Sequence, residues 1–167
     1  MTEDQILSPL TPTSWIRARL REDDALCALL GDQRGTNWGA GNALAPIYKA
    51  GEVPPTHPAR FVVVKPPLHH PTTYYACLAP RSMDSTFLVW AETQSDKLPP
   101  GLDLDGILDP IYRRLIHNLN GVQIPDALGG YVLQAEIVDT YTPLPLEIST
   151  NVKVGQMGIQ LALLSTV

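Results

Sequence analysis

The side chains that could bind a metal ion or carry out catalysis fall into one histidine group and two acidic groups. The histidine group consists of His57 and the adjacent pair His69 and His70. Neighbouring residues of a strand point to opposite faces, so His69 and His70 are poorly placed to hold one ion together. No Cys or Glu stands near them at a zinc-ligand spacing, and the H-E-x-x-H motif is absent. We therefore expect a solvated, proline-rich turn here and no metal site.

The acidic groups have a simpler interpretation than metal binding. The second group has the spacing D-x-D-x-x-x-D, which imitates part of a calcium loop but lacks the twelve-residue pattern and the closing bidentate Glu. We interpret both groups as helix caps and as partners of helix dipoles. The two groups are Glu22, Asp23 and Asp24, and Asp103, Asp105 and Asp109.

No nucleophile has the neighbours that would activate it. Cys27 lies on the apolar side of a predicted helix and Cys77 in a strand-like segment, so we expect two reduced, partly buried thiols. A G-x-S-x-G elbow and a phosphate-binding loop are absent, and Gly39-Ala-Gly41 does not link a strand to a helix. We expect no catalytic residue and no cofactor site, and therefore no enzymatic activity.

Composition favours a subunit of an assembly. The chain has 167 residues, which suits one domain. Charged residues make up 17% of it, below the roughly 25% of typical soluble domains, and a charge-poor surface favours an oligomer. The net charge of −5 argues against a dedicated nucleic-acid-binding protein, which needs a basic surface for phosphates. No apolar stretch is long enough to cross a membrane.

The clearest helical pattern covers residues 15 to 30. Thr11-Pro12 resembles an N-cap followed by proline at the first helical position. Asp23-Asp24 interrupts the helical pattern and can cap a second short helix, which Gly31 then ends. The apolar positions that follow the 3.6-residue period are Ile16, Leu20, Cys27 and Leu30.

A second amphipathic helix is predicted to end at Asn120-Gly121. Two starts are compatible with its sequence. Either Asp109 is the N-cap with Pro110 at the first helical position, or a first turn begins near Asp103 or Asp105 with Pro110 early within it. Its apolar stripe consists of Ile107, Ile111, Leu115 and Leu119.

Five segments are predicted to be extended. The segment Thr86–Thr93 is apolar on both faces, which indicates a central strand covered by helices on one side and by a neighbouring subunit on the other. The apolar phase of the last segment slips at Gly155, which predicts a β-bulge or bend. The five segments are 61–65, 74–78, 86–93, 131–140 and 151–164.

These elements predict an α+β fold in which two main helices pack on one face of a mostly antiparallel sheet. We expect a flexible N-terminal arm over residues 1–10 and a single domain over residues 11–167. A long Gly/Pro-rich loop over 31–58 is either a subunit contact or a disordered connector. The candidate subunit-interface residues are Trp38 in this loop and Leu88 and Trp90 on the central strand.

Three stretches together resemble the tail terminator proteins of long-tailed bacteriophages, also called tail completion or head-to-tail joining proteins. The first runs from Ile16-Arg-Ala-Arg-Leu20 to Asp24-Ala-Leu-Cys-Ala-Leu-Leu-Gly31. The second is the strand Thr86–Thr93, which leads through a turn into the helix ending at Leu119. The third is the closing pair of long strands.

This resemblance implies a ring-forming structural subunit of the virion, usually six-fold, with no catalytic residues. The implied ring caps the finished tail tube, stops its polymerisation and offers a surface to the head connector. Its partners would be other copies of this chain, the tail tube protein and the connector or neck protein. DNA would pass through the lumen without specific binding, because the acidic protein repels it. The protein would be in the host cytoplasm during assembly and in the virion afterwards.

Two other functions fit the same sequence. One is a head-closure or neck adaptor of the virion, whose small α+β or β-barrel fold has a similar composition. The other is a small ligand-binding α+β domain, which would need a pocket with convergent polar groups.

Overall fold

The computed structural model describes residues 12–31, 44–65, 72–73, 82–83, 85–125 and 132–166. Three α-helices lie in these ranges: α2 (Pro12–Arg21), α3 (Asp24–Leu29) and α4 (Leu104–Leu119). A 3₁₀ turn, η1, covers Ser95–Lys97. The strands are β1 (Ile47–Lys49), β2 (Phe61–Val64), β3 (Thr72–Thr73), β4 (Ser82–Met83), β5 (Ser85–Gln94), β6 (Val122–Pro125), β7 (Val132–Tyr141), β8 (Leu146–Ser149) and β9 (Val152–Thr166).

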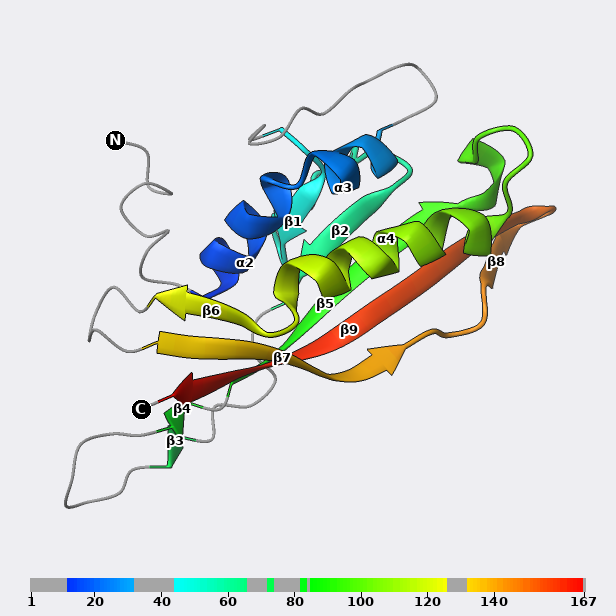
Figure 1. Cartoon of the computed structure of the whole chain (residues 1–167). Helices are drawn as coiled ribbons and strands as arrows, with labels where there is room; N and C mark the ends of the chain where they lie inside the picture. Colours follow the sequence, from blue (N-terminus) through cyan, green and yellow to red (C-terminus); the bar gives the residue numbers. More distant parts are fainter. Residues whose placement is uncertain are drawn as a thin grey trace.

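The main sheet has the strand order β1-β2-β5-β9-β7-β6, and β8 pairs with the first residues of β9. Every pairing in it is antiparallel except that of β1 with β2. All three helices lie on one face of this sheet (Figure 1). The predicted α+β class, with helices on one face of a mostly antiparallel sheet, is therefore confirmed. No helix within the described ranges is long and apolar enough to span a bilayer.

One hydrophobic core lies between the helices and the sheet. The predicted apolar stripes of both helical regions enter it, and the sheet contributes alternate residues of its strands. The largest fully buried side chains are Ile16, Leu20, Leu26, Leu30, Ile47, Ile111, Leu115, Leu119, Ile159 and Leu161.

The first helical region divides where the sequence predicts. Asp23 has an extended backbone and accepts hydrogen bonds from the backbone N–H groups of Ala25 and Leu26, which makes it the N-cap of α3. Pro12 is the first residue of α2. Asp24 follows the cap as the first residue of α3, where its carboxylate lies at the positive end of the helix dipole.

Helix α4 begins at the earlier of the two predicted starts. Asp103 is its N-cap and accepts a hydrogen bond from the Gly106 N–H at 2.7 Å. Pro110 therefore lies inside the helix, and the prediction that Asp109 is the N-cap is wrong. Packing explains the longer helix, because the earlier turn places Ile107 and Leu108 in the core.

The central position of β5 is confirmed, since it lies between β2 and β9. On the helix side, Val89, Ala91 and Thr93 are fully buried. Trp90 and Glu92 alternate with them and belong to the opposite face, where both are partly exposed.

The predicted bulge at Gly155 is wrong. The pairing of β9 with β5 continues without a shift through Gly155, which lies opposite Thr93. A Cβ atom at Gly155 would lie 2.9 Å from Leu108 Cδ1, so this glycine allows α4 to approach the sheet closely. The register shifts occur instead between Ile137 and Asp139 of β7, and between Glu147 and Ser149 of β8.

Parts of the sequence-based description lie outside the described residues. These are the N-terminal arm, the extended segment 74–78, Cys77 and residues 32–43 of the loop over 31–58. In the described part of that loop, β1 is a short extended piece that pairs with β2. The strands β3, β4, β6 and β8 also lie outside the segments predicted to be extended.

Candidate interaction surface

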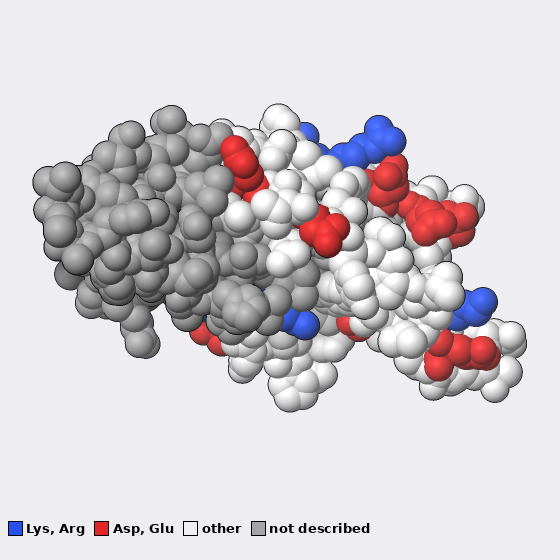
Figure 2. Space-filling view, turned by 90° about the horizontal axis from the view of Figure 1, so that it is seen from below, with Lys and Arg blue, Asp and Glu red and all other residues white. Residues whose placement is uncertain are grey.

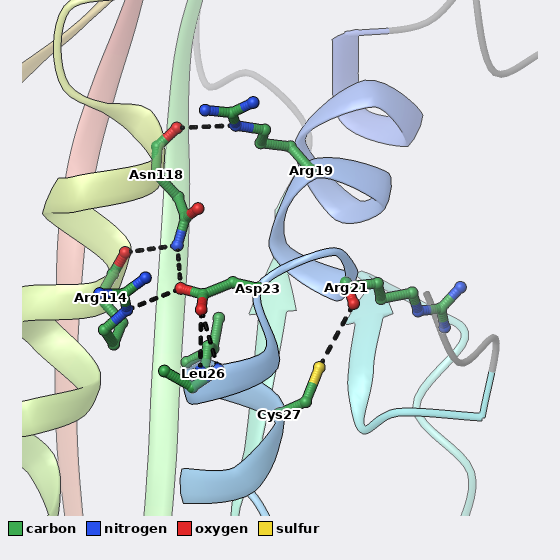
Figure 3. Close-up of polar contacts among 8 residues, drawn as sticks. Arg19, Arg21, Asp23, Leu26, Cys27, Arg114 and Asn118 are labelled. Atoms are coloured by element: carbon green, nitrogen blue, oxygen red, sulfur yellow. Dashed lines mark hydrogen bonds and ion pairs between the residues drawn. The ribbon is translucent and has the colours of Figure 1, made fainter. Parts of the chain in front are cut away.

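The most organised polar cluster in the described residues joins the α2–α3 turn to α4 (Figure 3). Asp23 Oδ1 accepts from the N–H groups of Ala25 and Leu26, at 3.0 and 3.2 Å. Asp23 Oδ2 accepts from Arg114 Nε at 2.8 Å and from the side-chain amide of Asn118. The Asn118 amide also donates to the carbonyl of Arg114.

This cluster is suited to holding helices together and poorly suited to catalysis. Burial alone would raise the pKa of Asp23, but hydrogen bonds from Arg114, Asn118 and the Leu26 N–H outweigh it, so the pKa is lowered. A carboxylate with a lowered pKa and four hydrogen-bond donors is a weak general base. Asp23 therefore acts here as a helix cap and as a tie between helices.

Cys27 is equally unsuited to nucleophilic chemistry. Its thiol is buried and donates to the carbonyl of Arg21 at 3.4 Å. Burial raises its pKa, and the negative charges of Asp23 and Asp24 raise it further. A buried thiol with a raised pKa stays protonated and is a poor nucleophile.

Of the three histidines in the predicted group, the structure describes only His57. Its ring packs against the ring of Phe61, tilted by 53° and with the ring centroids 4.3 Å apart. His117, the fourth histidine of the chain, is exposed on α4. His69 and His70 lie outside the described residues. Across the described ranges, no group of three or more His, Cys, Asp or Glu side chains is arranged to hold a metal ion. Asp103 and Asp23 are helix caps, as their sequence positions predicted.

A groove of about 740 Å³ lies between α4 and the connection from β7 to β8. We call it the α4 groove. Leu104, Leu108, Tyr112 and Met157 provide apolar lining, and Asp105 and Asp109 add two exposed carboxylates. The groove thus combines an apolar floor with an acidic rim.

Exposed large apolar side chains are concentrated beside this groove. Seven such side chains occur among the described residues, and five of them lie within residues 138–148. We call these five the β7–β8 apolar segment: Val138, Tyr141, Leu144, Leu146 and Ile148. Leu144 is 88% exposed and the other four are 56 or 57% exposed. A concentration of this kind is typical of protein–protein contact sites.

Two prolines restrict the backbone of the connection between β7 and β8, which contains Leu144. Leu144 lies between Pro143 and Pro145, which fix their own φ angles, and Pro145 also restricts Leu144 to extended conformations. The leucine is therefore presented to solvent with little remaining backbone freedom. Binding through it would cost less conformational entropy than binding through a flexible loop.

The free edges of the sheet differ in how they are protected. β7 is an edge only beyond its pairing with β6, and there the Ile137 N–H donates to the Asn120 side chain and the Thr140 N–H donates to Asp139. On β1, the carbonyl of Ile47 accepts from Arg21 at 3.0 Å. No hydrogen bond from another described residue protects the outer edge of β8, whose four residues are all exposed. An exposed apolar edge strand is a site for contact with another chain.

Of the three candidate interface residues, only the side chain of Trp90 is described. Trp90 lies on the face of the sheet opposite the helices, where it faces Tyr141 across Gly158 with ring centroids 5.6 Å apart. The Lys65 ammonium lies 5.6 Å from the centre of the indole ring. Trp38 lies outside the described residues. The backbone of Leu88 is in β5, but its side chain is not described.

Seen from below the view of Figure 1, much of the described surface is uncharged, and Asp, Glu, Lys and Arg side chains are scattered over it, several of them toward one end (Figure 2). Most of the β7–β8 apolar segment lies between the predicted strands 131–140 and 151–164, in residues to which the sequence pattern assigned no element. A signal was present in Leu144-Pro-Leu-Glu-Ile148, where apolar residues alternate. Alternation alone indicates a strand, but whether that strand is covered depends on the tertiary structure.

In comparisons with protein-family models, curated proteins and solved structures, nothing matched this chain. The interaction surface therefore has to be interpreted from its own chemistry.

Proposed function

We propose that this protein is a structural subunit of a bacteriophage virion. In this proposal it assembles into a ring, usually of six copies, that caps the tail tube and joins it to the head connector. The ring ends tail polymerisation and leaves a lumen through which DNA passes. The tail-terminator identity comes from the sequence resemblance, and the assembly part rests on the surface described above.

The observation that carries the assembly part is the β7–β8 apolar segment. Removing apolar surface from water is worth about 25 cal/mol per Å². Five large side chains that are each more than half exposed therefore represent a substantial driving force for association.

The polar chemistry of the described residues is consistent with a structural role. The cluster around Asp23 uses its carboxylate oxygens in helix capping and helix pairing. The net charge of −5 suits a lumen through which DNA passes, because like charges keep the phosphates from adhering.

The proposal is tested by measuring the mass of the purified protein by light scattering after size exclusion. The protein is measured at low and high concentration, alone and with purified tail tubes. We expect a discrete ring mass near six times 18.3 kDa, alone or on the tubes. A monomer at every concentration, with no binding to tail tubes, would contradict the proposal. Binding to the portal end of the connector, and none to tube ends, would favour a neck adaptor instead.

A further inference from the structure

We infer that the ring closes by insertion of the β8–β9 hairpin of one copy into the α4 groove of the next copy. This hairpin comprises Leu146–Ser149, the turn at 150–151 and the first residues of β9. The inference rests on the proposed function, because it names the contact that would build the ring. Neither the hairpin nor the groove belongs to the polar cluster around Asp23.

The hairpin has the form of an inserting element. It reaches the end of the sheet and extends past the start of α4 (Figure 1). Leu146 and Ile148 are each 56% exposed on it, and its outer edge is unprotected by the other described residues. Asn151 adopts a positive φ of 64°, which gives the hairpin a tight turn at its tip.

The groove offers complementary chemistry. Its floor of Leu104, Leu108, Tyr112 and Met157 can cover the two hairpin side chains. On its rim, Asp105 is exposed and forms no ion pair with another described residue. On the hairpin, Lys153 is likewise exposed and without an ion pair in the described ranges. Lys153 lies opposite Glu147 in the strand register. The carboxylate of one copy and the ammonium of the next can therefore meet at the groove rim.

The geometry favours another copy of this chain in a head-to-tail contact. The donor surface is the hairpin and the acceptor surface is the groove, so the two sides of the contact differ. Contacts between unlike surfaces generate rings when the rotation between copies closes. Each copy then gives one hairpin and receives one, which leaves no hairpin uncovered in a closed ring.

The first test introduces charge at the hairpin. Leu146→Asp and Ile148→Asp should each weaken the ring, because a carboxylate would enter an apolar groove. The protein concentration at which half of the copies are assembled should rise by about tenfold or more. Ala28→Asp is the control, since it places the same carboxylate at an exposed position of α3 that belongs to neither the hairpin, the α4 groove nor the β7–β8 apolar segment. Light scattering should give an unchanged ring mass for this control. Equal loss in all three variants would overturn the hairpin assignment.

The second test reverses the charge pair. Lys153→Asp alone and Asp105→Lys alone should each weaken assembly, and the double variant should recover it. Circular dichroism and urea unfolding check that every variant is folded, so that a lost ring is not a lost fold. Failure of the double variant to recover assembly would overturn the charge pairing at the rim.

The third test mixes two defective variants. A copy with Leu146→Asp and Ile148→Asp retains its groove, and a copy with Asp105→Lys retains its hairpin. Mixing them should give a complex of one copy of each and no ring. Rings from the hairpin variant on its own would overturn the inference while leaving the proposed function intact. A wild-type protein that forms no ring, with or without tail tubes, would contradict both the hairpin inference and the proposed function.

Discussion

The carboxylate of Asp23 and the guanidinium of Arg114 join the α2–α3 turn to α4, with Oδ2 and Nε 2.8 Å apart. The side chain of Asp23 is 4% exposed and that of Arg114 is 32% exposed. Ninety-one residues separate the two in sequence. The same carboxylate caps α3, so one residue determines both where a helix starts and what that helix packs against.

Asp23→Ala should lower the free energy of unfolding by about 2–4 kcal/mol, because the cap and the buried ion-pair partner are lost together. Asp23→Asn should lower the free energy of unfolding by less, since an amide oxygen can still accept the cap hydrogen bonds. Urea unfolding followed by circular dichroism measures both. A loss below about 0.5 kcal/mol for Asp23→Ala would show that the cluster does not stabilise the fold.

The contribution of Asp23 to stability should depend on pH. Its pKa in the folded protein is lowered from the ordinary value of 3.8, so the stabilisation is complete above that value. It is lost as the pH falls through the lowered pKa. The difference in unfolding free energy between wild type and Asp23→Asn should therefore be constant from pH 7 to 5 and shrink below pH about 4. A difference that grows on acidification would contradict the direction of the shift.

Gly155→Ala should destabilise the fold by about 1–3 kcal/mol through overpacking. The new methyl group would lie 2.9 Å from Leu108 Cδ1 and 3.1 Å from Leu104 Cδ2. Gly106→Ala is the control, because its Cβ would meet the exposed side chains of Asp103 and Leu102, at 3.0 and 3.3 Å, outside the core, and alanine favours a helix by up to about 1 kcal/mol. In thermal unfolding, the midpoint temperature of Gly155→Ala should be well below that of Gly106→Ala. The reverse order would contradict the close approach of α4 to the sheet.

Thr93→Val should stabilise the protein by about 1 kcal/mol. Thr93 is fully buried, and its hydroxyl has no hydrogen-bond partner among the described residues. Valine has nearly the same shape and removes a polar group that lost its water on folding. Urea unfolding measures the change, with Thr140→Val on exposed β7 as a control. Destabilisation would indicate that the Thr93 hydroxyl is satisfied in solution.

Trp90 and Tyr141 should be energetically coupled by about 0.5–1.5 kcal/mol, which is typical of aromatic pairs. A double-mutant cycle of Trp90→Ala and Tyr141→Ala, measured by urea unfolding at monomeric concentration, gives this value. A parallel cycle with Val138→Ala in place of Tyr141→Ala should give a coupling near zero. Equal coupling in the two cycles would show that the contact between the two aromatic side chains adds no specific stabilisation.

The fold class was predictable because hydrophobic periodicity is a local property. The spacing of Ile16, Leu20 and Leu30 marked the first helical region, and the long runs of apolar, strand-forming residues in β5 and β9 marked two long strands. Asp23 was predictable as a cap because capping depends on residues two and three positions away. The true start of α4 was one of two possibilities, and packing of Ile107 and Leu108 selected it.

The interaction surface was not predictable in the same way. Leu144, Leu146 and Ile148 are apolar residues of a kind that most proteins bury, and no local rule reveals that they are exposed. Exposure depends on which segments cover which others, so it is decided by contacts between distant residues. Gly155 illustrates the same limit, since its sequence position indicated a bulge while the structure uses it for close packing of α4.

The sequence by itself determined the two helical regions, the long strands β5, β7 and β9, the core-facing stripes of the helices and the absence of recognisable catalytic motifs, because these depend on residue type and short-range spacing. Only the tertiary structure decided that Asp23 meets Arg114, that α4 and the β7–β8 connection border a groove, and that β8 presents an uncovered apolar edge. The physical reason is that helix and strand propensities act over a few residues. Burial is a balance between surfaces that the chain brings together from far apart.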